Sequence, residues 1–350
     1  MSHRILHVLS QRPGRTGSGV TLDAVVRLAV RAGWTQAAVV GVPAGETAPE
    51  VGGLPAAAVH RVTFADPEAA GADLPFPVPG MSDVMPYPST VWSAMAAADL
   101  AGYRRVWRER LAAALAEFRP DLVHANHVWV ASSLLKDLAP DLPMVATCHA
   151  TGLRQMDLCP DLAEGVIRGC RRLDRFCVLH EAHREQLAAR LAVDPGRVTV
   201  IGAGYRDDLF RGPPADAATR RGQILYVGKF SRAKGVPWLL DAIASLAGSR
   251  PGLTLHVAGA GAGAEAEDLA ARMDALGPAV VRHGALTQPA LADLMRRCAV
   301  MVLPSFYEGV PLVLAEAAAC GCRLVATALP GVVGALAPHL ADRLELVPLP

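Results

Sequence analysis

The feature that most constrains the fold is an alternation of short apolar runs with longer amphipathic stretches. In roughly the first 200 residues the apolar runs are "ILHVLS", "AAVVGV", "DLVHAN", "PMVATCH", "RFCVLH" and "VTVIGAG". Strand and helix in alternation predict a parallel sheet. Fully apolar short strands such as "AAVVGV" fit a sheet that is covered by helices on both faces.

The same alternation restarts in the second part of the chain, with "ILYVGK", "LTLHVAG", "VVRHGA", "VMVLPS" and "RLVATA". Residues 205–223 gather Pro, Gly and charge without periodicity, so we interpret them as an interdomain linker. A chain of 350 residues suits two domains. We therefore predict an α/β protein with two doubly wound, Rossmann-like domains, residues 1–205 and 206–350. Ligands of such sheets bind beyond the carboxyl ends of the strands, which predicts an interdomain cleft.

Composition excludes several classes of protein. The 34 basic and 33 acidic residues nearly balance, so a nucleic-acid partner is not expected. Seven cysteines without a CxxC spacing indicate buried thiols in a reducing compartment. The first residues do not form a signal peptide, and no apolar run reaches the ~18 residues of a membrane span. We expect a cytoplasmic protein.

One long segment breaks the alternation. Residues 66–92 spread prolines through an aperiodic stretch that also contains aromatic and methionine residues. Loops of this length are usually functional or disordered. An ordered lid or substrate loop and a disordered segment are both open.

Two glutamates lie eight positions apart in "YEGVPLVLAEAAACG". Pro311 suits the first position of a helix and Gly321 suits the residue just past its end, so Glu308 falls in a loop and Glu316 on the helix. A buried glutamate without a partner is costly. Either Glu308 lies at the surface while Glu316 is salt-bridged, or both face a ligand.

Basic and glycine-rich loops also follow predicted strands. In "ILYVGKFSRAKG" Lys229 ends a strand and Lys234 precedes a helix, so both ammonium groups could meet one diphosphate, although lysines are usually solvated. In "SQRPGRTGSGVTLD" Gly17 and Gly19 lie where a helix start can meet an anion, or merely form a turn. Leu22 occupies the place of the third glycine of a dinucleotide fingerprint, which argues against a nicotinamide site.

Histidines 124, 127, 149 and 180 fall at or just after predicted strand ends. One such histidine is usually structural, but four at one edge of a sheet suggest a site. His149 in "TCHATG" is the strongest candidate, with bracing of its loop as the alternative.

Together these motifs resemble a known family. "ILYVGKFSRAKGVPWLLDAIASL", "HGALTQPALADLMRRCAVMVLPSFYEGVPLVLAEAAACG", "DLVHANH", "TCHATG", "RRLDRFCVLHEAHREQL" and "VTVIGAGY" look, in order, like the group-1 glycosyltransferases, the retaining family-4 enzymes of the GT-B fold. The resemblance runs over nearly the whole chain and is poorest at residues 42–105.

The resemblance implies roles for the motif residues. Glu308 would lie near the transferred sugar and Glu316 on the ribose hydroxyls, which suits carboxylates as acceptors. Lys229 and Lys234 would hold the donor diphosphate, where Lys229 replaces the commoner arginine and loses its bidentate fork. His149 would contact the donor sugar. The full implied set is catalytic His149 and Glu308, and donor-binding Gly17, Gly19, Lys229, Lys234, Glu308, Gly309, Val310, Leu312, Val313 and Glu316.

The resemblance also implies an activity. A retaining, hexosyltransferase-type enzyme would move a sugar from a UDP- or GDP-sugar, held mainly by the second domain, to an acceptor held mainly by the first. The acceptor stays open between sugar, lipid-linked, small-molecule and protein classes. No DxD loop motif is present, so neither a metal nor a cofactor is expected. The alternatives are a GT-B sugar-nucleotide epimerase and an inactive nucleotide-sugar-binding protein.

Two further expectations concern the ends and surface of the chain. The sequence stops at Pro350 without the last helices of the family. The Arg-rich helix predicted over 103–119 is the nearest candidate for membrane contact, and we interpret it as a solvated face.

Overall fold

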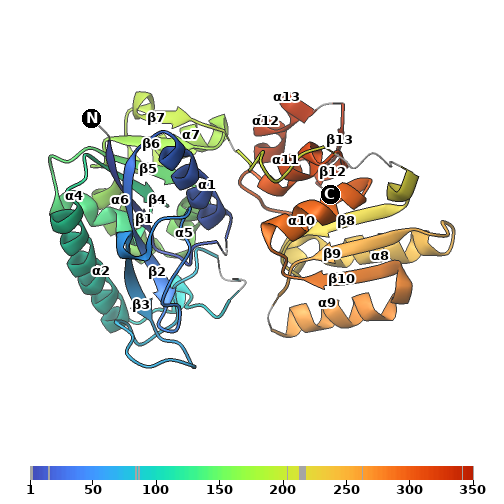
Figure 1. The fold of residues 1–350 in the computed structure, drawn as a ribbon, viewed down its shortest axis with the longest axis horizontal. Coiled ribbons are helices and arrows are strands. Elements are labelled where there is room, and N and C mark those ends of the chain that lie inside the picture. Colours follow the sequence, from blue (N-terminus) through green and yellow to red (C-terminus); the bar gives the residue numbers. More distant parts are fainter. Residues whose placement is uncertain are drawn as a thin grey trace. The chain divides into compact units, whose positions relative to one another are not determined.

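The computed structural model describes residues 3–14, 16–82, 85, 87–202, 204–212, 218–261, 263–340 and 342–349. The chain divides into two compact units, Met1–Gly202 and Ala203–Pro350. Each unit contains one parallel sheet with helices packed against it (Figure 1). The boundary expected from the sequence, between residues 205 and 206, lies just after this division.

The first unit has a seven-stranded sheet in the order β3-β2-β1-β4-β5-β6-β7. Its strands are β1 (Arg4–Leu9), β2 (Thr35–Pro43), β3 (Val59–Phe64), β4 (Leu122–Asn126), β5 (Met144–Cys148), β6 (Arg175–Val178) and β7 (Val198–Val200). Its helices are α1 (Gly17–Arg31), α2 (Ala97–Phe118), α3 (Val130–Ser133), α4 (Leu135–Leu138), α5 (Thr151–Leu158), α6 (Pro160–Cys170) and α7 (Glu181–Leu191). The strand order reverses between β1 and β4, which makes their carboxyl ends the switch point of this sheet.

The apolar run of β2 shows why this sheet is covered on both faces. Successive side chains of a strand point to opposite faces. Val39 packs in the cluster that contains Trp107 of α2, whereas Val40 packs in the cluster that contains Val26 of α1. Helices α1 and α2 accordingly lie on opposite sides of the sheet (Figure 1).

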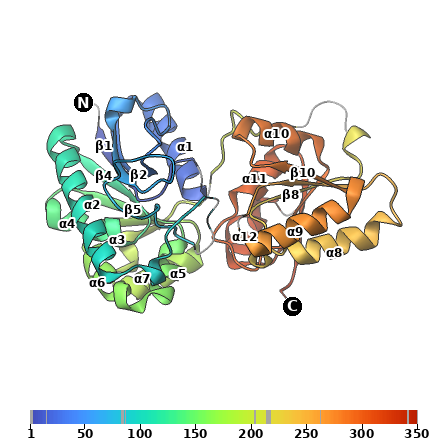
Figure 2. The ribbon, with the colours of Figure 1, turned by 90° about the horizontal axis from the view of Figure 1, so that it is seen from below.

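The second unit has a six-stranded sheet in the order β10-β9-β8-β11-β12-β13. Its strands are β8 (Gln223–Val227), β9 (Thr254–Ala258), β10 (Val280–Gly284), β11 (Val300–Leu303), β12 (Arg323–Thr327) and β13 (Leu344–Val347). Its helices are α8 (Val236–Ala247), α9 (Ala264–Ala275), α10 (Gln288–Arg297), α11 (Leu312–Ala319), α12 (Pro330–Ala335) and α13 (Ala337–Leu340). Helices α8 and α9 lie side by side (Figure 2), and the strand order reverses between β8 and β11.

In its described part, the aperiodic segment 66–92 forms no helix or regular strand before the short 3-10 turn at Trp92–Ala94. The segment is nevertheless packed into the first unit. Its buried apolar side chains are Leu74, Phe76, Val78, Met81, Met85, Tyr87 and Trp92. These side chains extend the core that α2 covers, which accounts for the aromatic and methionine content of the segment. Residues 83, 84 and 86 lie outside the described residues.

The expected linker, residues 205–223, is packed on the second unit where it is described. Phe210 is only 1% exposed, and the Arg220 Nε donates to the Cys298 carbonyl at 2.9 Å. Its residues 213–217 lie outside the described residues. None of the described helices combines the length and hydrophobicity that a membrane span requires.

Candidate functional site

The predicted donor-binding residues of the second unit gather at the switch point of its sheet. Lys229 follows β8 and Glu308 follows β11, and these two strands are hydrogen-bonded neighbours. Because the sheet is parallel, the loops after both strands emerge at the same edge. Side chains that are far apart in sequence are therefore brought together by the strand order alone.

A short ion pair connects these two loops. Lys234 Nζ donates to Glu308 Oε1 at 2.7 Å, and Ser305 Oγ donates to the same oxygen at 2.7 Å. Lys234 Nζ also lies 3.4 Å from the Tyr307 carbonyl oxygen. The side chains of Lys234 and Glu308 are 25% and 16% exposed, so the pair is partly shielded from water. The alternative of a Glu308 that simply lies at the loop surface is wrong.

A glycine allows the two loops to approach closely. Gly235 has a φ of +71°, and a Cβ added there would lie 2.0 Å from the Pro304 carbonyl oxygen. Phe306 N also donates to the Ala233 carbonyl at 3.0 Å. Any larger residue at position 235 would separate the Lys234 loop from the Glu308 loop.

Lys229 lies within electrostatic reach of this pair. Burial, then the positive charge of Lys234, lowers the pKa of Lys229 to about 8, and the Glu308 carboxylate opposes the shift. The two ammonium groups therefore share one region of the second unit, as a diphosphate site requires.

Glu316 has an environment opposite to that of Glu308. It lies on α11, is 6% exposed, and its burial raises the pKa of the carboxyl to about 7. No described cation offsets this burial, so the alternative of a salt-bridged Glu316 is wrong. A buried carboxyl without a compensating charge is costly to keep ionised, which makes this position a candidate for binding hydroxyl donors.

Helix α11 begins one residue later than predicted. Pro311 is its N-cap, with φ −75° and ψ 96°, and Leu312 and Val313 open the first turn. First-turn N–H groups have no intrahelical acceptor and point toward the positive end of the helix dipole. Gly331 at the start of α12 packs closely on Gly309, because a Cβ added to it would lie 1.6 Å from the Gly309 carbonyl oxygen. Gly321 follows the helix with φ +83°, as predicted.

The switch point of the first unit also has a polar contact across its two loops. His127, which follows β4, places Nε2 3.0 Å from Gln11 Oε1 and 3.0 Å from Ser18 Oγ. Its Nδ1 lies 3.2 Å from Thr151 Oγ1. His127 has a φ of +71°, an uncommon conformation for a residue other than glycine, which the surrounding contacts maintain.

His149 lies beside His127, with ring centroids 5.0 Å apart. Burial and the neighbouring His127 hold the pKa of His149 well below its usual value, so its imidazole is neutral. Asn126 donates its amide to the Val8 carbonyl at 3.4 Å, which leaves Asn126 Oδ1 to accept from His149 Nε2 at 3.1 Å. His149 Nδ1 therefore carries the lone pair and is an acceptor.

The other two histidines of the predicted edge lie in different surroundings. His124 Nδ1 is 3.1 Å from His7 Nδ1 on the neighbouring strand. His180 instead packs against His183, with ring centroids 3.6 Å apart. Of the four predicted histidines, the described structure thus brings His127 and His149 into ring contact.

The glycine loop of the first unit has two different roles. Gly17 opens α1 with no atom within 4 Å of an added Cβ, whereas an added Cβ on Gly19 would lie 2.7 Å from Gly14 N. The Gly19 N–H is already bonded to Thr16 Oγ1 at 3.3 Å. Gly19 is therefore required for loop packing, and its amide is occupied by the cap.

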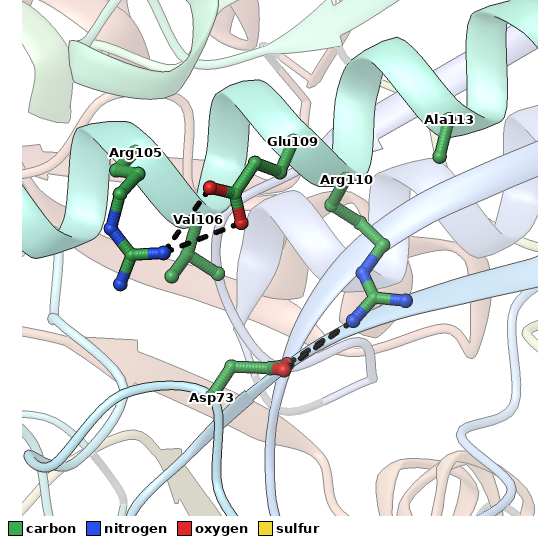
Figure 3. Close-up of a pocket in the computed structure, with 6 residues that line it drawn as sticks. All are labelled: Asp73, Arg105, Val106, Glu109, Arg110 and Ala113. Atoms are coloured by element: carbon green, nitrogen blue, oxygen red, sulfur yellow. Dashed lines mark hydrogen bonds and ion pairs between the residues drawn. The ribbon is translucent and has the colours of Figure 1, made fainter.

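Two surface hollows lie elsewhere in the molecule, and neither is lined by a predicted site residue. One of about 310 Å³ lies over α2, where Arg110 pairs with Asp73 at 3.4 Å and Arg105 with Glu109 at 3.2 Å (Figure 3). Another of about 340 Å³ lies between residues 208–212 and α10. The paired arginines of α2 fit the solvated face that the sequence predicted. Within the described residues, no three His, Cys, Asp or Glu side chains gather to hold a metal ion.

Sequence reasoning missed several polar partners, listed here: Gln11, Ser18, Asn126 and Ser305. Each of these residues ends a central strand, follows one, or lies at the start of the next helix. A polar residue at such a position is the sequence signal by which they could have been found. The strand order that makes them neighbours was absent from the sequence.

With this geometry established, comparison with known proteins defines the class. Residues 53–209 match the family described as Glycosyltransferase Family 4, and residues 221–344 match the one described as Glycosyl transferases group 1. The chain belongs to the group 1, family 4 glycosyltransferases.

Curated relatives agree with this assignment. Glycogen synthase of Mycobacterium tuberculosis (strain H37Rv) is 31% identical over 232 residues, which cover 61% of this chain and 54% of the relative. A D-inositol 3-phosphate glycosyltransferase of Segniliparus rotundus is 29% identical over 64% of this chain and 54% of its own length. The chain thus spans about half the length of the curated relatives it matches.

Solved structures confirm the predicted GT-B fold class. Sucrose-phosphate synthase from Thermosynechococcus elongatus superposes with a TM-score of 0.68 at 21% identity, covering 99% of this chain and 86% of that one. Anabaena Alr3699/HepE in complex with UDP and glucose superposes with a TM-score of 0.63 at 18% identity, covering 94% and 82%. At these identities the likeness concerns the fold alone.

Proposed function

We propose that this chain is a retaining, metal-independent glycosyltransferase that moves a hexose from a nucleotide-diphosphate sugar, a UDP- or GDP-sugar, to an acceptor. The observation that carries the proposal is the Lys234–Glu308 ion pair at the switch point of the second sheet, with Lys229 beside it. The relatives' names and the UDP and glucose bound by Alr3699/HepE support the donor class. A cytoplasmic location belongs to the same proposal.

The chemistry follows from the charges at this site. Two ammonium groups and the first-turn amides of α11 stabilise negative charge on the leaving diphosphate. Glu308, positioned by Lys234 and Ser305, accepts hydrogen bonds from the transferred sugar. Glu316 accepts from the ribose hydroxyls. In the first unit, the lone pair on His149 Nδ1 is able to accept a sugar hydroxyl.

Donor binding tests this proposal directly. A thermal-shift panel of UDP-, GDP- and ADP-sugars identifies the donor, and calorimetry then compares variants. We expect Lys234→Ala to weaken donor binding by about 1.5 to 3 kcal/mol, the range of a hydrogen bond to a charged group. Arg250→Ala removes an exposed cation after α8 and serves as the matched control, with donor affinity unchanged.

Unchanged donor affinity in Lys234→Ala, or equal losses in both variants, contradicts the placement of the diphosphate. Product analysis without any acceptor separates the alternatives. A converted nucleotide sugar indicates an epimerase, whereas binding without turnover across a broad acceptor panel indicates an inactive binding protein.

A further inference from the structure

An exposed aromatic cluster lies on the second unit beside the candidate donor site. Trp238 on α8, and Phe306 and Tyr307 in the loop after β11, are 47%, 38% and 42% exposed. Burying such side chains is the usual way to stabilise a fold, so their exposure together in one place indicates a binding surface.

The cluster is ordered by its own contacts. The rings of Trp238 and Phe306 have centroids 4.9 Å apart at an interplanar angle of 59°. The guanidinium carbon of Arg232 lies 5.3 Å from the Trp238 ring centroid, within the range of a cation–π interaction. The Arg232 backbone N–H is held by Glu265 Oε1 at 3.1 Å. The surface therefore combines apolar ring faces with a guanidinium that has several hydrogen-bond donors.

Its position ties it to the Lys234–Glu308 pair. Tyr307 directly precedes Glu308, and its carbonyl oxygen lies 3.4 Å from Lys234 Nζ. Phe306 N donates to the carbonyl of Ala233, the residue before Lys234. The Trp238–Phe306 ring pair is therefore carried by the same two segments that hold Lys234 and Glu308.

Size and chemistry select the occupant. Three aromatic side chains exposed to this extent present on the order of 250 Å², well below the roughly 800 Å² per partner of a stable protein interface. One or two sugar rings cover such an area. Their C–H faces pack on aromatic rings, and their hydroxyl groups accept hydrogen bonds from a guanidinium. A nucleobase is disfavoured, because the ribose end of the donor is assigned to Glu316 on α11.

We propose that Arg232, Trp238, Phe306 and Tyr307 form an acceptor platform, a surface that binds the saccharide part of the acceptor beside Glu308. This inference rests on the proposed function for its assignment to an acceptor. The binding of a saccharide to the platform can be measured without any donor or turnover.

The test uses the full chain on a glycan array, followed by fluorescence titration with each bound oligosaccharide. Trp238 is the one tryptophan of the second unit among the five of the chain, at positions 34, 92, 107, 129 and 238. We expect oligosaccharides to change its emission, and we expect Trp238→Ala and Phe306→Ala to weaken binding roughly tenfold or more. Trp238→Phe keeps an aromatic ring and should keep part of the affinity.

Trp34→Ala is the matched control, since Trp34 is a 40% exposed tryptophan of the first unit, and it should bind glycans normally. Donor affinity, measured by calorimetry with UDP-glucose, should stay unchanged in Trp238→Ala, which also shows that this variant is folded. No bound glycan on the array, or equal glycan affinity in Trp238→Ala and wild type, overturns the platform. Donor binding by Lys234→Ala is measured in a separate experiment. Failure of the proposed function can therefore be distinguished from failure of the platform.

Discussion

Glu316→Gln offers the most direct test of the second-unit site, because the structure assigns it an effect on stability of unusual sign. Burial raises the pKa of Glu316 from 4.5 to about 7. The folded state therefore holds a proton that the unfolded state has released between these values. Stability accordingly falls as pH rises from 4.5 through 7, and the full penalty is present above pH 7.

The magnitude follows from the shift. One pKa unit corresponds to about 1.4 kcal/mol, so an ionised Glu316 costs the folded state about 3 kcal/mol at pH 8 and less than about 1 kcal/mol at pH 5. Gln has nearly the same size and does not titrate. We expect Glu316→Gln to gain about 2 to 3 kcal/mol at pH 8 relative to its effect at pH 5.

The assay is urea-induced unfolding followed by circular dichroism at the two pH values, with donor calorimetry in parallel. The difference between the two pH values cancels effects of the substitution that do not depend on pH. Glu308→Gln is the control of opposite sign, because Glu308 accepts charge-assisted bonds from Lys234 and Ser305. It should lose about 1 to 3 kcal/mol at both pH values.

Function should change in the opposite direction to stability. If Glu316 accepts the ribose hydroxyls in ground and transition states alike, its variant should raise the KM for donor, whereas Glu308→Gln should mainly lower kcat. A residue that destabilises the fold but is required for ligand binding is typical of functional sites. Lower stability of Glu316→Gln at pH 8 together with normal donor affinity would refute this reasoning.

Three further outcomes are expected. Donor affinity should fall as pH rises above about 8, because Lys229 loses its charge there. In calorimetry from pH 7 to 9.5, Lys229→Arg should remove this dependence. A wild-type donor affinity that does not change with pH contradicts a role for the Lys229 charge. Burial lowers the pKa of His124 to about 3 and that of His7 to about 4, so stability should decline as pH falls below 6.5. In acid unfolding, His124→Gln should reduce the slope of the unfolding free energy against pH by at most about 1.4 kcal/mol per pH unit. An unchanged slope refutes the buried pair. Sugar transfer should survive EDTA, and loss that Mg²⁺ or Mn²⁺ restores counts against metal independence.

The acid prediction has a structural basis in the hydrogen-bond directions of the pair. Gln36 donates its amide to the Val26 carbonyl at 3.1 Å, so its Oε1 accepts from His7 Nε2 at 2.9 Å. A neutral His7 then accepts at Nδ1 from His124 Nδ1, and His124 Nε2 accepts from Thr147 Oγ1 at 2.8 Å. Protonation of both rings places two Nδ1–H donors face to face.

The sequence by itself determined the layers of the fold. Apolar runs such as residues 37–42 of β2 are readable because a strand buried on both faces favours apolar side chains on each of them. The spacing of Pro311 and Gly321 likewise determined that Glu308 is in a loop and Glu316 on a helix, because backbone conformation there depends on those residues themselves. The family motifs carried the same local information.

Only the tertiary structure decided which of these residues meet. The pairing of Lys234 with Glu308, and of His127 with Gln11, depends on the reversal of strand order between neighbouring strands, which connects loops far apart in the chain. One alternative from the sequence expected a surface Glu308 and a salt-bridged Glu316, which is the reverse of what the structure shows. Burial and partners depend on the packing around each side chain. Glu308 pairs with a cation because Gly235 lets the Lys234 loop approach Pro304, whereas Glu316 is buried with no described cation beside it. Local patterns specify backbone and burial, but contacts between distant loops arise only when the sheet assembles.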